Sequence, residues 1–170
     1  IDIHSEIYHH THYRYQEILD HKQRRIPMQG KSKTKTKQVL VIEDDKTWIT
    51  CIDNMVGSLG METINLKPVR SAKEALSLIE QYHQKSDFIL LDMNLGHGTF
   101  NDSRADGYKI AAHLHIRHPK GSEILAKTIC NSGLADDYVK ILRPLGIRHF
   151  GGKSNFSACL MGKCNCETAD

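Results

Sequence analysis

The sequence lacks the features that mark membrane and secreted proteins. No apolar run approaches the roughly 18 residues that a membrane helix needs, and residues 1–10 do not join a basic patch to an apolar stretch as a signal peptide does. An odd number of cysteines without a disulfide-rich composition fits a reducing compartment: Cys51, Cys130, Cys159, Cys164 and Cys166. We therefore expect a cytoplasmic globular protein that is not bound to a membrane.

A strong charge of one sign is also missing from most of the chain. Residues 1–37 hold eight Lys or Arg and four Asp or Glu, whereas residues 38–170 hold fifteen and sixteen. A nucleic-acid-binding domain would usually carry a basic face on its body. Nucleic-acid binding is therefore not expected, beyond weak non-specific contacts from the lysines of residues 31–37.

The first 37 residues form a leader with its own composition. Apolar residues fall on one helical stripe over residues 5–25, which predicts an amphipathic helix, and residues 31–37 are a basic, polar linker. Five of the eleven histidines lie in this leader, in no spacing typical of a metal site. The pair Cys164 and Cys166 near the other end is a weak zinc signal, since no second pair accompanies it. The chain starts with Ile1, so the natural start stays open.

From residue 38 onward, apolar runs alternate with helical patterns. The runs predict strands at 39–42, 61–66, 88–91, 124–130 and 147–150, and the patterns predict helices near 48–59, 72–82, 105–118, 138–145 and 155–161. Ser71 and Glu74 match a capping box at the start of one helix. Five such repeats predict an α/β domain over 38–162, a parallel sheet with helices on both faces, and a short tail at 163–170.

Polar side chains gather where these strands end. Glu43, Asp44 and Asp45 follow the first strand, Asp92 the third, Ser132 the fourth and Lys153 the fifth. In open parallel sheets the active crevice lies at the carboxyl ends of the strands. Clustered carboxylates need a counter-charge, and Mg²⁺ prefers carboxylates, waters and phosphate oxygens. A carboxylate can also act as a nucleophile toward phosphorus. The set therefore indicates phosphoryl transfer onto an aspartate, although Asp45 could simply cap the next helix.

Three stretches, 39–45, 88–95 and 146–153, resemble the signature segments of response-regulator receiver domains in two-component signalling. The resemblance covers about residues 38–160. It implies a flavodoxin-like five-stranded sheet in the order 2-1-3-4-5. It also implies that Asp92 accepts a phosphoryl group from a sensor histidine kinase or a histidine phosphotransfer protein, with Mg²⁺ as cofactor.

The resemblance also implies individual roles. Asp44 and Asp92 would bind Mg²⁺ directly, Glu43 through water and Asn94 through its backbone carbonyl. Lys153 would contact the phosphoryl group, while Ser132 and Phe150 would be the hydroxyl and aromatic residues of the switch. We expect such a receiver to catalyse its own phosphorylation and dephosphorylation without being an enzyme for a separate substrate. An effector, or a second copy in a homodimer, would bind the surface of the fourth helix and fifth strand. That surface would include Tyr138, Lys140, Arg143, Arg148 and Phe150.

The sequence departs from the family in several places. Ser154 stands where a proline is usual, Gly151 and Gly152 end the fifth strand, and residues 96–104 lengthen the loop after Asp92. Ser132 is one residue too close to the fifth strand for the common spacing, so Asn131 is the alternative occupant of the hydroxyl position. These departures leave open a second function, a degenerate receiver that docks or dimerises without phosphorylation.

Two further expectations concern other classes of protein. An aspartate-nucleophile phosphatase of the haloacid-dehalogenase kind would carry a second Asp two residues after the nucleophile, where Asn94 stands. That class is therefore disfavoured. Only seventeen residues, 154–170, follow Lys153, too few for an output domain of ordinary size. We therefore expect the receiver to act through a partner or within a larger protein such as a hybrid kinase.

Overall fold

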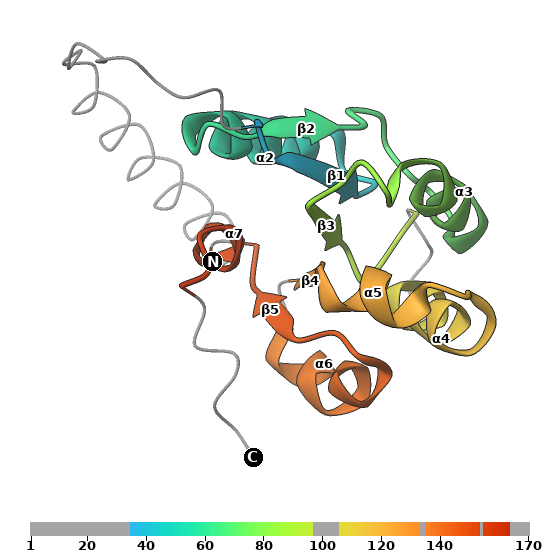
Figure 1. Cartoon of the computed structure of the whole chain (residues 1–170). Helices are drawn as coiled ribbons and strands as arrows, with labels where there is room; N and C mark the ends of the chain where they lie inside the picture. The colour runs from blue at the N-terminus through green and yellow to red at the C-terminus, as the bar shows by residue number, and fades with distance from the viewer. Residues whose placement is uncertain (1–34, 97–105, 133–134, 154, 164–170) are drawn as a thin grey trace, which may run out of the picture. The chain divides into compact units, whose positions relative to one another are not determined.

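A five-stranded parallel sheet forms the centre of the protein (Figure 1). The computed structural model describes residues 35–96, 106–132, 135–153 and 155–163, and the sheet with its helices belongs to the compact unit that begins at Thr36. The strands are β1 (Gln38–Ile42), β2 (Glu62–Ile64), β3 (Phe88–Leu91), β4 (Thr128–Asn131) and β5 (His149–Gly151). Their order, β2-β1-β3-β4-β5, and the parallel pairing of all neighbours confirm the predicted topology.

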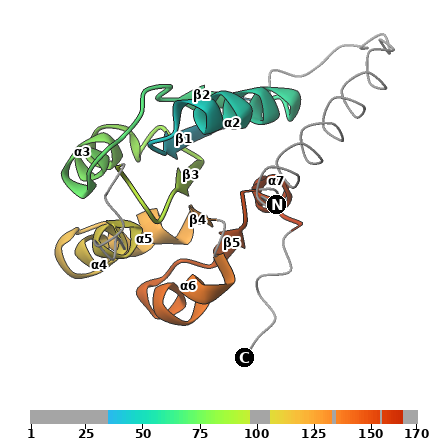
Figure 2. The ribbon, with the colours of Figure 1, turned by 180° about the vertical axis from the view of Figure 1, so that it is seen from behind.

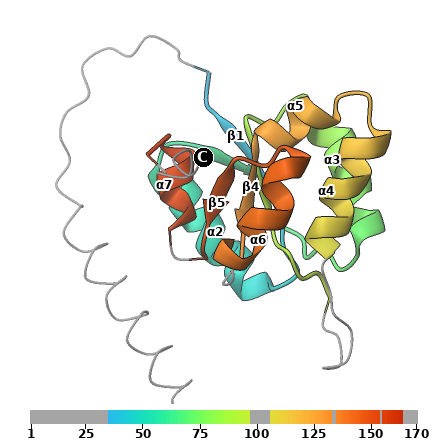
Figure 3. The ribbon, with the colours of Figure 1, turned by 90° about the horizontal axis from the view of Figure 1, so that it is seen from below.

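Helices cover both faces of this sheet, as Figures 2 and 3 show from behind and from below. One face packs against α2 (Lys46–Ser58) and α7 (Phe156–Leu160). The other packs against α3 (Ala72–Tyr82), α4 (Asp106–Arg117), α5 (Gly121–Ala126), α6 (Ala135–Leu142) and the 3-10 turn η1 (Arg143–Leu145). Each helix buries one apolar stripe, and the loss of that apolar surface from water drives the packing.

The strands supply both cores because successive side chains of a strand point to opposite faces. Val39 and Val41 of β1 belong to the core under α2 and α7, whereas Leu40 and Ile42 belong to the core under α3, α4 and α6. All four side chains have no exposed surface. A strand that is buried on both faces has a continuous run of apolar residues in its sequence. This is why residues 39–42 predicted a buried strand.

Side-chain caps fix the starts of α2 and α3. Asp45 Oδ1 accepts hydrogen bonds from the backbone N–H of Thr47 at 2.8 Å and of Trp48 at 3.3 Å. Ser71 Oγ accepts one from the N–H of Glu74 at 3.2 Å. These contacts satisfy N–H groups that have no partner within the helix. They confirm the cap predicted at Ser71, and they show that Asp45 does cap the helix that follows it.

The expected strand at 124–130 was wrong in its first half. Residues 121–126 form α5, and β4 begins at Thr128. Both Ile124 and Leu125 are wholly buried in a helix, and a short apolar run cannot distinguish that arrangement from a buried strand. Thr128 Oγ1 donates to the carbonyl of Ile124 at 2.8 Å, at the junction between the two elements. β2 and β5 are each displaced or shortened by one or two residues relative to the prediction.

Several predictions lie outside the described residues. They concern the leader helix at 5–25, most of the linker at 31–37, the inserted loop beyond Gly96, and the pair Cys164 and Cys166. Among the helices that the structure describes, none has both the length and the apolar character required to cross a membrane.

Candidate functional site

Three carboxylates meet at the carboxyl ends of β1 and β3. Ile42 and Leu91 are register partners, so Glu43 and Asp92 follow side by side, and the N–H of Asp92 donates to the carbonyl of Ile42 at 2.9 Å. Carboxylate oxygens of Glu43, Asp44 and Asp92 lie within 4.8 Å of one another. Glu43 is wholly buried and Asp92 is 4% exposed. The structure therefore brings together the acids that the sequence predicted.

Backbone contacts hold two of these acids in place. Glu43 Oε1 accepts the N–H groups of Asp44 and Asp45, each at 3.2 Å. Asp44 Oδ2 accepts the N–H of Gly96 at 2.9 Å. The second contact ties the end of β1 to the segment that follows β3, so the start of the inserted loop is anchored to a residue of the acid cluster.

Lys153 brings the opposite charge to the cluster. Its ammonium nitrogen lies 3.3 Å from Glu43 Oε2 and 5.6 Å from the centre of the Trp48 ring. The side chain reaches the cluster because Lys153 follows β5 by two residues, at the same edge of the sheet as Glu43 and Asp92. The sequence predicted Lys153 at this edge, but it gave no sign that Trp48, in the first turn of α2, would flank it.

The acids resist ionisation in the absence of a metal. Burial, and then the charge of Asp92, raise the pKa of Glu43 to about 7 against the opposing pull of Lys153. Burial also raises the pKa of Asp92 to about 6, although Lys153 and the backbone N–H groups of Met93 and Asn94 lower it. For Lys153, burial acts to lower the pKa, but Asp92 and Glu43 outweigh it and the pKa is raised. A divalent cation would supply the positive charge that these carboxylates lack.

The donor set fits Mg²⁺. Mg²⁺ takes hard oxygen ligands, usually one or two carboxylates with waters and phosphate oxygens. Glu43, Asp44 and Asp92 offer three carboxylates at one point, and burial raises the pKa values of Glu43 and Asp92. Asn94, predicted to contribute its backbone carbonyl, is exposed two residues beyond Asp92.

The strand register determines which residue of β4 lies beside Asp92. Leu91 pairs with Cys130, so continuing this register places Asp92 next to Asn131, with both side chains on the same face. Ser132 lies one residue further on, where the pleat turns the side chain to the opposite face. Both residues are buried, and the amide atoms of Asn131 have no hydrogen-bond partner among the described residues. The register thus favours Asn131 over Ser132 for the hydroxyl position.

Phe150 and the surface of α6 and β5 complete the predicted switch region. Phe150 is 8% exposed and lies in the core, with the Arg143 guanidinium carbon 6.0 Å from its ring centre. On α6, Lys140 is exposed and Ile141 is 45% exposed. The aromatic side chain is therefore in its inward position, beneath a surface that combines basic and apolar groups.

Gly151 has a specific steric reason to be a glycine. A Cβ atom there would lie 2.6 Å from Cα and 3.1 Å from the backbone nitrogen of Phe156. The glycine lets α7 approach β5 closely, so packing requires it at this position. This contact lies two residues before Lys153 and helps to fix the path of the chain into the site.

Comparisons with known proteins identify the fold. No protein-family sequence model matches the chain, and no curated protein matches it closely enough to count as a relative. Solved structures do match. The receiver domain of a Pseudomonas aeruginosa sensor histidine kinase, with magnesium coordinated in its active-site cleft, is 21% identical, with a TM-score of 0.53 over 75% of this chain and 93% of that chain.

Two other solved structures are similar to the same extent. A response-regulator receiver domain from Methylobacillus flagellatus is 17% identical, with a TM-score of 0.53 over 76% of this chain and 99% of that one. A sensor protein from Polaromonas sp. JS666 is 19% identical, with a TM-score of 0.55 over 75% and 91% of the two chains. The protein therefore has the receiver-domain fold, as the sequence motifs predicted.

Proposed function

We propose that this protein is a phosphoacceptor receiver of two-component signalling, in which Asp92 takes a phosphoryl group in the presence of Mg²⁺. The observation that carries the proposal is the joint placement of Glu43, Asp44, Asp92 and Lys153 at the carboxyl edge of a receiver-type sheet. Buried acids whose pKa values are raised and which face a lysine such as Lys153 are typical of a functional site. A structural role alone does not account for two buried carboxylates side by side.

In the reaction, a carboxylate oxygen of Asp92 attacks the phosphorus of a phosphohistidine on the donor protein. The new O–P bond forms as the P–N bond breaks, and the imidazole of the donor leaves with the electron pair of that bond. Because the pKa of Asp92 is about 6, its carboxylate is mostly ionised at neutral pH and can act as the nucleophile. Lys153 neutralises charge on the phosphoryl oxygens. Bound Mg²⁺, held by Glu43, Asp44 and Asp92, would supply charge neutralisation and orientation of the phosphoryl group.

The donor would be a sensor histidine kinase or a histidine phosphotransfer protein, and the receiver would act in the cytoplasm. The output would be a change at the surface of α6 and β5, read by an effector protein or by a second copy of the chain. In this scheme the protein catalyses its own phosphorylation and dephosphorylation and turns over no separate substrate.

A second function, a receiver that docks without phosphorylation, has two observations in its favour. Asn131 replaces the hydroxyl beside Asp92, and Phe150 already lies inward. A switch that depends on a hydroxyl following the phosphoryl group, and on an aromatic ring moving inward, would therefore be weakened.

The test is beryllofluoride, a phosphoryl mimic, added to the full chain with and without Mg²⁺ and followed by amide NMR. We expect Mg²⁺-dependent shifts at Asp92, Asn131, Phe150 and Lys153, and their loss in Asp92→Asn. The matched control is Asp53→Asn, a carboxylate on α2 away from the strand ends, which should respond like the parent protein. A folded protein that shows no Mg²⁺-dependent shift would overturn the proposal in favour of the docking module.

A further inference from the structure

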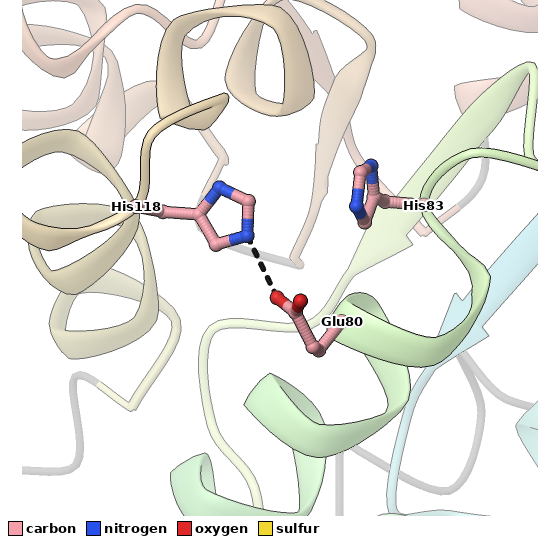
Figure 4. A group of neighbouring side chains, drawn as sticks. All are labelled: Glu80, His83 and His118. Atoms are coloured by element: carbon pink, nitrogen blue, oxygen red, sulfur yellow. Dashed lines mark hydrogen bonds and ion pairs between the residues drawn. The ribbon is translucent and has the colours of Figure 1, made fainter.

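A second group of metal-ligating side chains lies at the opposite edge of the sheet from Asp92. Glu80 is in the last turn of α3, His83 directly follows that helix, and His118 directly follows α4. The helices α3 and α4 lead into β3 and toward β4, so their ends lie near the amino ends of the strands. Figure 4 shows the three side chains converging on one point.

The contacts within this group are close. His118 Nε2 lies 2.7 Å from Glu80 Oε2, and the His83 and His118 rings meet edge to face with their centres 5.5 Å apart. One ligand atom from each of the three side chains lies within 4.8 Å of the others. Ligand atoms around a tetrahedral zinc ion stand roughly 3.3 Å apart, given metal–ligand bonds of about 2.0–2.1 Å. Shifts of about 1 Å would therefore bring all three into coordination.

His83 is the unusual member of the group. The residue is 3% exposed, and its buried Nδ1 has no hydrogen-bond partner among the described residues. A buried polar group without a partner carries a desolvation cost that calls for an explanation. Burial, and then the neighbouring His118, lower the pKa of His83.

The plain alternative is an ion pair between Glu80 and His118, with His83 packed beside it. That alternative accounts for the contact between Glu80 and His118 and for the edge-to-face packing of the two rings, but it leaves the buried Nδ1 of His83 without a partner among the described residues. Two imidazoles and a carboxylate are a donor set that zinc uses when it keeps one position open for water. Glu80 has an exposed side chain, at 69%, and can move to adjust the geometry.

We propose that Glu80, His83 and His118 form a binding site for Zn²⁺, separate from the Mg²⁺ site at the carboxyl edge. The ion joins the end of α3 to the end of α4, two helices that pack against each other. Its fourth position takes water. The site does not depend on the proposed phosphorylation of Asp92.

Two features of the structure limit the affinity. The N–H of Lys120 donates to His118 Nδ1 at 3.0 Å, so the proton of the neutral ring sits on Nε2, facing Glu80. Coordination through Nε2 moves this proton to Nδ1 and leaves the Lys120 N–H to water. The ammonium groups of Lys120 and Lys127 also lie close enough to lower the pKa of His83, and they oppose a cation. Both features should weaken the binding of a cation at this site.

The lost hydrogen bond supplies a marker that is specific to this site. When zinc binds, the amide resonance of Lys120 should shift together with the ring nitrogens of His83 and His118. Zinc bound by the leader histidines, by Cys164 and Cys166, or by the carboxylates around Asp92 would leave these three signals in place.

The experiment is a Zn²⁺ titration of the full chain in excess Mg²⁺, followed by NMR of imidazole nitrogens and backbone amides. We expect saturable shifts at His83, His118 and Lys120, with affinity at least about tenfold weaker in Glu80→Gln and in His118→Gln. The control is His113→Gln, an exposed histidine of α4, which should leave these shifts unchanged. Since Glu80 is exposed, its variant tests the site even if His118→Gln fails to fold.

Two results would overturn the proposal. One is a titration in which other resonances saturate while those of His83, His118 and Lys120 stay fixed. In that case Glu80 and His118 would form only an ion pair. The other is unchanged zinc affinity at these resonances in Glu80→Gln. Neither result affects the beryllofluoride test of Asp92, because that response needs only Mg²⁺ at the opposite edge of the sheet.

Discussion

The ammonium nitrogen of Lys153 lies 3.3 Å from Oε2 of Glu43, a carboxylate with no exposed surface. Lys153 is thus the main positive charge available to two buried acids among the described residues, and it does not fully offset their burial, since the pKa values of Glu43 and Asp92 stay raised. The site holds an excess of negative charge that costs folding free energy at neutral pH, and this excess yields testable consequences.

Glu43→Gln should increase the stability of the metal-free protein at neutral pH. The folded-state pKa of Glu43, about 7, is above the ordinary glutamate value of 4.5. The folded form then binds more protons than the unfolded form between these values, so this group makes the free energy of unfolding fall as pH rises through that window. At about 1.4 kcal/mol per pKa unit, the fall is about 3 kcal/mol at most.

The measurement is urea unfolding of the parent protein and of Glu43→Gln from pH 4 to pH 8 in chelator. The free energy of unfolding of Glu43→Gln should exceed that of the parent protein by an amount that grows as pH rises. The lowered pKa of His83 makes the free energy of unfolding rise with pH, opposite to the effect of Glu43. His83 is present in both proteins, so its contribution cancels in the difference. Glu123→Gln, at an exposed position, is the control. A difference that is independent of pH would contradict the raised pKa.

Mg²⁺ should stabilise the parent protein more at pH 8 than at pH 5. At the lower pH the protons on Glu43 and Asp92 compete with the metal, and at the higher pH the carboxylates are ionised and repel one another. Ligand binding raises the free energy of unfolding through mass action. The single tryptophan, Trp48, lies beside Lys153 and gives a fluorescence readout of the same titration. Equal stabilisation at both pH values would argue that the metal binds elsewhere.

Much of this site follows from the sequence because parallel topology carries strand ends to one edge. The runs at 39–42 and 88–91 predicted buried strands, and the residues after them therefore had to meet. The contact between Trp48 and Lys153 was not predictable, since it depends on the path of the chain after β5. The same holds for the bond between Asp44 and Gly96, which joins residues 52 positions apart.

The choice between Asn131 and Ser132 shows a different limit. A shift of one residue in a strand moves every side chain to the other face, and strand ends are known from sequence only to within a few residues. Only the pairing of Leu91 with Cys130 decides which side chain lies beside Asp92.

Asn131→Ala should therefore weaken beryllofluoride binding by about tenfold, because a hydrogen bond to a charged group contributes about 1.5–3 kcal/mol. Ser132→Ala should leave the affinity close to that of the parent protein. The stability of the metal-free Asn131→Ala protein should change little, since the amide has no partner among the described residues. Asn131→Thr, which restores a hydroxyl, should recover part of the affinity. NMR titration measures the beryllofluoride affinity of all three variants. A loss of affinity confined to Ser132→Ala would show that Ser132, and not Asn131, lies beside the phosphoryl group.

Gly151→Ala should destabilise the protein and displace Lys153. The new Cβ would lie 2.6 Å from Cα of Phe156, a backbone atom that cannot move without shifting α7. Overpacking of this kind typically costs about 1–3 kcal/mol. Gly57→Ala in α2 is the matched control, because its Cβ meets nothing within 4 Å, and replacing a helical glycine by alanine stabilises by about 0.5–1 kcal/mol. Urea unfolding should thus give opposite signs for the two variants. If Gly151→Ala were as stable as the parent protein, α7 would not be held against β5, and the path that delivers Lys153 to Glu43 would need another support.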